Sequence, residues 1–395
     1  MRLRNFLDRL TNLKILFFFY IGLTLIVSFA EIEKGNRDFG GRSYPHYNNY
    51  LIFSKSFYHL IEKKDLYTLF PDEHWDLFKY SPTFALLMGF FAIFPEHFGL
   101  ILWNLLNSLL PFFAIKSINL IDERRRAYIL WFIVIDTVTS MQNSQSNGLI
   151  AGLLILAFVF FEKRKVHLSA LFLVLSLFVK PIGFVSFFLF LLYPKKFKFL
   201  LFSLIFAILF LLLPILSVSP SHLYFLYKSW MNLLMRDYSL YEGLSVFGIL
   251  KKWFGLSLSK QIVIFSGIFL FLLPFLRKKL FEKIEFRFLL LSSSLIWAVI
   301  FNHKAESPTF VIATCGVAIW YFYGRKRVDD LLLLIFYFLI TSISSTDLTP
   351  LFLKEKFVKP YLLKALPSIL VWIKIQMELL FSKFESKETT CSPSF

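Results

Sequence analysis

The chain consists of a long series of apolar runs joined by short polar or basic connectors. A run of about 20 apolar residues crosses a membrane as an α-helix, because the helix satisfies every backbone polar group internally. Several runs are shorter than this, which predicts short or broken spans. The runs cover residues 13–30, 98–120, 127–141, 148–161, 168–179, 182–193, 199–216, 262–276, 288–301, 309–323, 331–344 and 361–381. They predict an all-α polytopic membrane protein with a bundle of about twelve transmembrane helices.

Composition and charge agree with this class. Of the 395 residues, 57% are hydrophobic and only 17% are charged, whereas apolar residues make up about half of a soluble protein. A net charge of +17 would suggest nucleic acid binding in a soluble protein, but here the basic residues lie in the connectors. This bias marks the cytoplasmic side of a membrane protein. Membrane lipid is therefore an expected partner, and nucleic acid is not.

The same bias sets the orientation in the cell (inner) membrane. The segments expected to be cytoplasmic are the N-terminus, the connectors 124–126, 163–165, 195–196, 277–279 and 325–327, and the tail. The first run, behind Arg2, Arg4 and Arg9, resembles a signal peptide, but an uncleaved span that anchors the next loop is the simpler interpretation. We expect one membrane-embedded domain over residues 1–395, with both termini cytoplasmic and a tail at 382–395.

The apolar segment 81–94 is the exception to a simple count. It has about 14 residues, fewer than a perpendicular span needs, and it lies between Ser81-Pro82 and Pro95. A full span here would place Arg124-Arg125-Arg126 outside. We therefore expect a juxtamembrane or re-entrant helix within a long extracytoplasmic loop at 31–97. A true span, with the arginines outside, is the alternative.

Polar hairpin tips fall on the opposite face from the basic connectors. They are 31–80, 142–147, 180–181, 217–260, 302–308 and 347–360. The first tip mixes acids with aromatic rings, which suits sugar chemistry because rings stack on pyranose faces and a carboxylate can accept a hydroxyl proton. Asp38 lies just beyond the first span and is the leading general base. A solvated turn aspartate is the alternative reading.

A second acidic group follows in the same loop. Residues 72–76 read Asp-Glu-His-Trp-Asp, so Glu73, His74, Trp75 and Asp76 are candidates for substrate contact. Helix capping by Asp72 explains part of this pattern equally well. The ligand spacing matches no closed metal site. Cys315 and Cys391 lie in different settings and also suggest none, so we expect no metal.

The remaining tips offer neutral and cationic groups. The amides of Gln145 and Asn147 can recognise sugar hydroxyls, or they can simply satisfy helix ends. Lys180 interrupts an apolar stretch, where a lysine is costly unless it faces water or an anion. It can bind the phosphate of a lipid carrier or snorkel from a turn. His303 and Lys304 can hold phosphate with Glu306 orienting them, unless the three form only a local salt bridge.

In their order, these motifs resemble glycosyltransferase family 87. The motifs are Asn49-Tyr50-Leu51-Ile52-Phe53, Asp65-Leu66-Tyr67, Lys79 to Ala85 with Tyr80, Leu102-Trp103-Asn104, Gln145-Ser146-Asn147 and Lys180-Pro181. The likeness runs from about Asp38 to Pro181 and more faintly through Asn302 to Trp320. The chain is similar to polyprenyl-phosphate-mannose-dependent mannosyltransferases of the GT-C superfamily.

The resemblance implies a GT-C-like fold and a hexosyltransferase, with mannose as the implied sugar. The donor would be a sugar on a polyprenyl phosphate, and the acceptor a lipid-linked or envelope glycan on the extracytoplasmic face. Attack by an acceptor hydroxyl would expel polyprenyl phosphate with inversion. Side chains can neutralise that phosphate, and the sequence has no Gly-rich nucleotide loop, so no cofactor is expected. Besides the candidates above, the implied substrate-binding residues are Asn49, Tyr50, Asp65, Tyr67, Tyr80, Trp103 and Asn104.

One position departs from the family pattern. Members carry a catalytic aspartate in an Asp-Phe-x-x-Tyr segment of the first outer loop, and counting back from Asp65 leads to Asn49. An amide cannot accept a proton from a hydroxyl. Either Asp38 supplies the base, since Asp38-Phe39 has the right dipeptide, or Asp76 or Glu73 does. An inactive or altered protein is the third possibility.

Two rival functions remain. A transporter or flippase for a lipid-linked sugar would favour ionisable residues near mid-membrane and repeat symmetry. Asp136, inside an apolar run, is the main residue in its favour. A polysaccharide polymerase or ligase is the second rival, and its use of a polyprenyl diphosphate donor would separate it from the family above.

Overall fold

The computed structural model describes residues 10–236, 243–324, 327–344 and 346–384. Arg2, Arg4, Arg9, the pair Arg325-Lys326 and most of the tail predicted at 382–395 lie outside the described residues. Helices make up most of the described chain, and its one sheet is a two-stranded hairpin. The prediction of an all-α protein is confirmed in this coarse form.

Three helices are long and apolar enough to cross a membrane. They are α2 (Leu13–Glu33), α6 (Glu96–Lys116) and the helix Lys196–Leu216, each of 21 residues. At 1.5 Å per residue, each is about 32 Å long, which matches the hydrocarbon core. All three coincide with predicted runs. The other predicted spans fall on helices that are shorter or more polar, so the number of about twelve stays a prediction.

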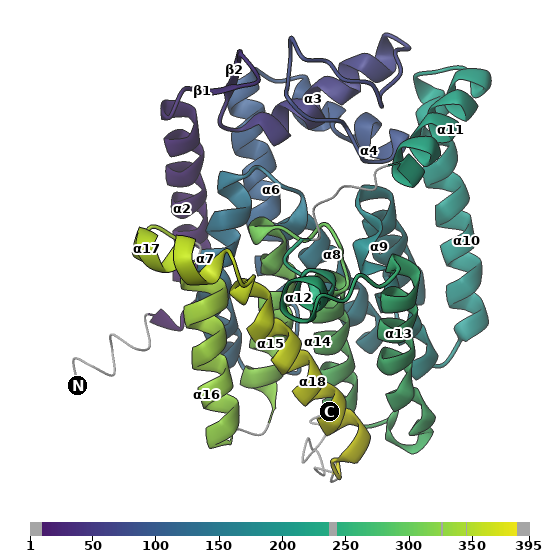
Figure 1. The fold of residues 1–395 in the computed structure, drawn as a ribbon. Helices are drawn as coiled ribbons and strands as arrows, with labels where there is room; N and C mark the ends of the chain where they lie inside the picture. The colour runs from purple at the N-terminus through teal and green to yellow at the C-terminus, as the bar shows by residue number, and fades with distance from the viewer. Residues whose placement is uncertain (1–9, 237–242, 325–326, 345, 385–395) are drawn as a thin grey trace.

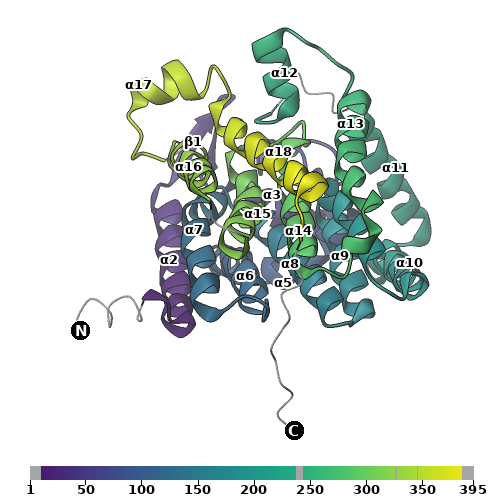
Figure 2. The same ribbon diagram turned by 90° about the horizontal axis from the view of Figure 1, so that it is seen from below.

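Most helices run side by side in one bundle (Figure 1). Among the tightest neighbours are α14 with α15, α6 with α8, and α8 with α9. In Figure 2, α18 crosses over α14 and α15. The bundle helices besides α2 and α6 are α7 (Glu123–Gln142), α8 (Asn147–Glu162), α9 (Val166–Val179), η1 (Pro181–Leu192), α10 (Lys196–Leu212), η2 (Leu213–Leu216), α13 (Lys260–Leu272), η3 (Leu273–Leu276), η4 (Lys278–Leu280), α14 (Ile284–Ile300), α15 (Phe310–Tyr323), α16 (Val328–Tyr337), η6 (Phe338–Ile343) and α18 (Leu366–Phe381).

Short elements cover the end of the bundle drawn at the top of Figure 1, which we call the upper end. The first loop contributes the hairpin strands and three helices, and α11 joins them from the middle of the chain. These elements are β1 (Asn36–Phe39), β2 (Arg42–Pro45), α3 (Asn48–Ile61), α4 (Pro82–Leu87), α5 (Gly89–Ala92) and α11 (Pro220–Arg236). The other short helices are α12 (Val246–Phe254), η5 (Ser307–Thr309), α17 (Leu351–Leu353), η7 (Lys354–Val358) and η8 (Leu363–Ala365).

The segment 81–94 forms α4 and α5, which are both too short to cross a membrane. Ser81 caps α4 by accepting a hydrogen bond from the backbone N–H of Phe84 at 3.1 Å, and Pro82 occupies the first helical position. The helix stops at Met88 and restarts at Gly89. α4 packs against α3 and η2, and the expectation of a juxtamembrane or re-entrant helix stays a prediction.

The close approach of α8 to α6 fixes the start of α8. A Cβ on Gly148 would lie 2.0 Å from the carbonyl oxygen of Asn107, so the two backbones can meet only at glycine. The Asn107 side-chain oxygen also accepts a hydrogen bond from the backbone N–H of Leu149 at 2.9 Å. Asn147, the first residue of α8, is thereby held at the upper end.

Candidate functional site

The turn between α7 and α8 lies at the centre of the upper end. Asn49 in α3 donates a hydrogen bond through Nδ2 to the carbonyl oxygen of Asn143 at 2.9 Å. Trp103 in α6 donates through Nε1 to the carbonyl oxygen of Ser144, also at 2.9 Å. Ser144 has a positive φ of 48°. Hydrogen bonds from α3 and α6 therefore hold the turn on two sides, and Gln145 and Ser146, which follow it, lie next to Tyr80 of the first loop.

Tyr80 and Lys180 reach this turn from two other segments. The Tyr80 hydroxyl lies 3.4 Å from Oε1 of Gln145 and 3.3 Å from Oγ of Ser146. Lys180 donates a hydrogen bond through Nζ to Oδ1 of Asn147 at 3.3 Å. Together with charged neighbours these residues form what we call the tyrosine–lysine cluster: Asp76, Lys79, Tyr80, Gln145, Ser146, Asn147, Lys180, Lys304 and Glu306.

Among the described residues, this cluster contains three ammonium groups and two carboxylates, and both carboxylates are within electrostatic range of Tyr80. Lys79 pairs with Asp76 at 3.1 Å. Lys180 is within electrostatic range of Glu306 and Lys79, and Lys304 is within range of Lys79, Asp76 and Glu306. Within the described part of the chain the ammonium groups of this cluster outnumber its carboxylates, which favours an anion beside a carboxylate.

The surroundings of Lys304 shift the pKa of its ammonium group. Burial lowers the pKa of Lys304 to about 8, and the charge of Lys79 adds to this shift, whereas Asp76 and Glu306 oppose it. A lysine with such a pKa is partly neutral near physiological pH. Perturbed titration in a cluster of converging polar groups is typical of a functional site.

Local sequence explains how the cluster is held. The Tyr80 ring stacks on Phe84 with centroids 4.7 Å apart and meets the edge of Phe53 at 4.8 Å. Lys180 ends α9 in an extended conformation, and Pro181 begins the next helix. Trp230 in α11 donates through Nε1 to the carbonyl oxygen of Lys79 at 3.1 Å, which brings α11 against this part of the loop.

The loop acids predicted as bases lie in different surroundings. Asp38 is exposed on β1, opposite Ser43. Its neighbours Arg37 and Phe39 both contact Trp75, so in an alternating strand Asp38 points the other way. Asp76 belongs to the tyrosine–lysine cluster, and its side chain is 50% exposed.

Glu73 is engaged away from the cluster, by His59 of α3. The two side chains are 2.9 Å apart, with His59 buried beneath the loop. Burial lowers the pKa of His59, and Glu73 opposes that shift. His74 is also buried, and burial lowers its pKa. These residues hold the loop on α3.

Several residues implied by the resemblance are packed inside the upper end. The Asp65 carboxylate accepts hydrogen bonds from Ser229 at 2.9 Å and from the backbone N–H of Tyr67 at 3.1 Å. Buried hydroxyls and amides have partners of their own. The Tyr50 hydroxyl donates to the Phe91 carbonyl oxygen at 3.4 Å, and the Tyr67 hydroxyl donates to the Tyr80 carbonyl oxygen at 3.0 Å. The Asn104 amide donates to Ser28 Oγ at 3.0 Å. Their contacts build the loop that presents Tyr80.

His303 points into different surroundings from its neighbour Lys304. Its ring lies beside Phe247 of α12, with centroids 6.2 Å apart, and lines a small cavity with Lys260. Burial and the charge of Lys260 lower the pKa of His303 to about 4. The structure brings Lys304 and Glu306 to the cluster, and turns His303 away.

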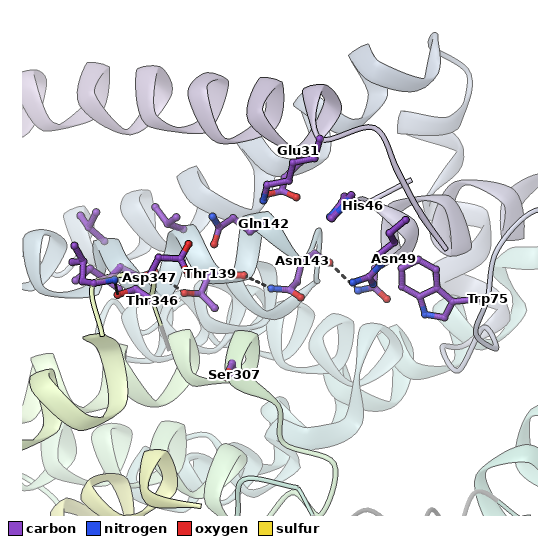
Figure 3. A pocket seen from close by; sticks show the side chains of 16 residues that line it. Glu31, His46, Asn49, Trp75, Thr139, Gln142, Asn143, Ser307, Thr346 and Asp347 are labelled. Carbon is purple, nitrogen blue, oxygen red and sulfur yellow. Dashed lines mark hydrogen bonds and ion pairs between the residues drawn. The ribbon is translucent and has the colours of Figure 1, made fainter. Parts of the chain in front are cut away.

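A cavity of about 530 Å³ adjoins the cluster on the other side of the 142–147 turn. Figure 3 shows its side chains converging from several segments. We call it the side cavity. Its polar lining is Glu31, Lys34, Arg37, His46, Asn49, Trp75, Thr139, Gln142, Asn143, Ser307, Thr346 and Asp347. The sequence analysis had named Asn49 and Trp75 as site residues, and it had placed Gln142, Asn143, Ser307 and Asp347 only within polar hairpin tips.

Comparison with known families gives one match. The model described as glycosyltransferase family 87 matches residues 78–346, more than half of the chain. The matched stretch contains Lys79, Tyr80, the 145–147 motif, Lys180 and the 302–309 tip, and it begins after Asp38, Glu73 and Asp76. No curated protein matches the chain.

Proposed function

Because the chain belongs to glycosyltransferase family 87, a family of membrane glycosyltransferases, we propose that it moves a hexose from a polyprenyl phosphate to a glycan acceptor. Mannose is the proposed sugar, and the acceptor is lipid-linked or part of the cell envelope. The reaction takes place at the upper end, which we place on the extracytoplasmic face. The observation that carries this proposal is that Lys180 and Lys304 both lie within electrostatic range of Lys79 and Glu306.

The cluster supplies what the leaving group needs. As the bond between the anomeric carbon and the phosphate oxygen breaks, negative charge develops on polyprenyl phosphate. Ammonium groups fixed in a partly buried site stabilise that charge more than water does, because they need no reorganisation. Lys180 and Lys304 hold the phosphate in our proposal, and Asn147 orients Lys180. The Tyr80 hydroxyl and the Gln145 amide bind sugar hydroxyls.

Asp76 is the proposed base. It accepts the proton of the acceptor hydroxyl as that oxygen bonds to the anomeric carbon, and polyprenyl phosphate leaves from the opposite side with inversion. Among the three acids that the sequence suggested, Asp76 alone shares the cluster with the lysines. Asp38 lies on an exposed strand, and Glu73 is paired with His59. This geometry favours Asp76.

The function is tested by giving purified protein polyprenyl-phosphate-mannose together with envelope glycolipid extracts. We expect sugar transfer together with release of polyprenyl phosphate. Lys180→Met should raise the donor KM about tenfold, the value of one charge-assisted contact. Lys228→Met, on α11, is the matched control. Movement of intact donor across vesicles without release of polyprenyl phosphate would instead support the transporter.

Donor use should also depend on pH through Lys304. Its ammonium is present below a pKa of about 8 and is lost as pH rises through that value, so binding of the donor phosphate weakens in the same direction. We expect kcat/KM for the donor to fall about tenfold between about pH 7 and pH 9. Lys304→Arg keeps its charge over this range and should flatten the profile. An equal fall in both proteins would remove Lys304 from the phosphate site.

A further inference from the structure

We propose that the side cavity is the acceptor site and that Arg37 recognises an acidic group on the acceptor glycan. This inference rests on the proposed transferase function and names the chemical class of its second substrate.

The side cavity and the tyrosine–lysine cluster share three stretches of backbone. Trp75 lines the cavity while Asp76 lies in the cluster. Ser307 lines the cavity while Glu306 lies in the cluster. In the 142–147 turn, Asn143 lines the cavity while Gln145 lies in the cluster. The cavity and the cluster therefore lie on neighbouring residues of the same three segments, and in our proposal the acceptor extends its reacting hydroxyl from the cavity to Asp76.

The lining of the cavity suits a saccharide. Polar side chains from α2, α3 and α7 face the space, including the amides of Asn49 and Gln142 (Figure 3). Glu31 is only 3% exposed and pairs with Lys34 at 2.5 Å. An ion pair at the wall of a cavity offers both an acceptor and donors to hydroxyl groups. The volume of about 530 Å³ falls within the range of small-molecule sites.

Arg37 gives the cavity its preference for an acid. Its guanidinium lies 4.0 Å above the Trp75 ring, and the Trp75 backbone N–H donates to Oδ1 of Asn48 at 3.2 Å. Within the described part of the chain, Arg37 has no carboxylate partner, whereas Arg42 on the same hairpin pairs with Asp72 at 2.7 Å. A guanidinium that is oriented by stacking and lacks a counter-ion is suited to bind a carboxylate or phosphate.

The opposite end of the cavity is lined by Asp347, whose carboxylate pairs with Lys354 at 3.4 Å. Asp347 and Trp75 lie at opposite ends of the view in Figure 3. Of the lysine and arginine side chains in the described lining, Lys34 is paired with Glu31 and Arg37 has no carboxylate partner, so an acidic group is favoured at the Arg37–Trp75 end.

The test measures binding to the purified protein in lipid nanodiscs by saturation-transfer NMR. The three probes are methyl glucoside, methyl glucuronide and methyl glucoside 6-phosphate, which distinguish a carboxylate from a phosphate. We expect one or both acidic probes to bind about tenfold more tightly than the neutral sugar, the value of a charge-assisted bidentate contact. Arg37→Gln should abolish the preference, and Arg42→Gln should keep it.

Three results would overturn the inference: equal binding of the three probes, undetectable binding of both acidic probes, or a preference that survives in Arg37→Gln. Circular dichroism and thermal unfolding check that both variants are folded. Release of polyprenyl phosphate by the wild type is measured separately. If release is absent while Arg37-dependent binding is present, the transferase proposal has failed and the acidic-ligand site has not.

Discussion

Asp76→Asn lowers the rate of sugar transfer by about two to four orders of magnitude, the contribution of a positioned general base, and leaves donor binding intact. An asparagine cannot accept the proton of the attacking hydroxyl. Removing the carboxylate also makes the tyrosine–lysine cluster more positive, since Lys79 loses its partner at 3.1 Å. The donor KM should therefore stay unchanged or decrease, while kcat decreases by the factor given above. Steady-state kinetics with polyprenyl-phosphate-mannose separate these two constants.

Asp38→Asn is the matched control for this prediction. The same substitution is made on the same loop, but Asp38 is exposed on β1 and faces away from Trp75. We expect its kcat to remain within about twofold of the wild type, as for a surface substitution away from the site. If Asp38→Asn instead abolishes transfer and Asp76→Asn does not, the base belongs on the hairpin and the hairpin must close over the cluster during the reaction.

The bundle was largely predictable from the sequence because membrane helices leave a strong signal. Leu13–Glu33, Glu96–Lys116 and Lys196–Leu216 coincide with apolar runs, and Pro82 with its short apolar segment correctly indicated helices too short to span. Positive-inside bias also grouped the polar tips on one end, where the structure brings the 142–147 turn, Lys180 and the 302–309 tip to the first loop.

The details of the site were less predictable, because they depend on packing between distant segments. Sequence spacing cannot show that Lys180 meets Asn147, or that adjacent residues His303 and Lys304 point into different surroundings. The side cavity combines the end of α2, the hairpin, α7 and residues 346–348. The sequence predicted Asn49 and Trp75 as site residues and placed 142–147 and 347–360 at polar tips, but it did not show that these segments enclose one cavity.

Asp136 connects the site to the rest of the bundle. It lies in α7, whose last residues include Thr139 and Gln142 in the side cavity. Its side chain is fully buried, and Lys364 of η8, 2% exposed, approaches its Oδ1 to 3.9 Å. Thr314 and Ser342 donate hydrogen bonds to Oδ2 at 2.9 and 2.6 Å. Three C-terminal elements, η8, α15 and η6, are thus joined to α7 around one carboxylate. This structural role accounts for the buried Asp136 without a transport function.

Removing one partner of this buried pair should have the largest effect on stability. Lys364→Met leaves the Asp136 carboxylate without its counter-charge inside the bundle, which costs about 3–5 kcal/mol. Asp136→Asn removes the charge opposite Lys364 and should cost a similar amount. The double variant buries neither charge, so we expect it to recover most of the loss. Equilibrium unfolding in mixed detergent micelles measures the three values and gives the coupling between the two residues.

The activity of the double variant distinguishes a structural pair from a functional one. If Asp136 and Lys364 only join α7 to the C-terminal helices, a double variant of recovered stability should also recover sugar transfer, because the side cavity keeps its walls. A stable double variant without transfer would instead assign the pair a part in the reaction. Additive losses, with no recovery in the double variant, would contradict the ion pair itself, since uncoupled sites add.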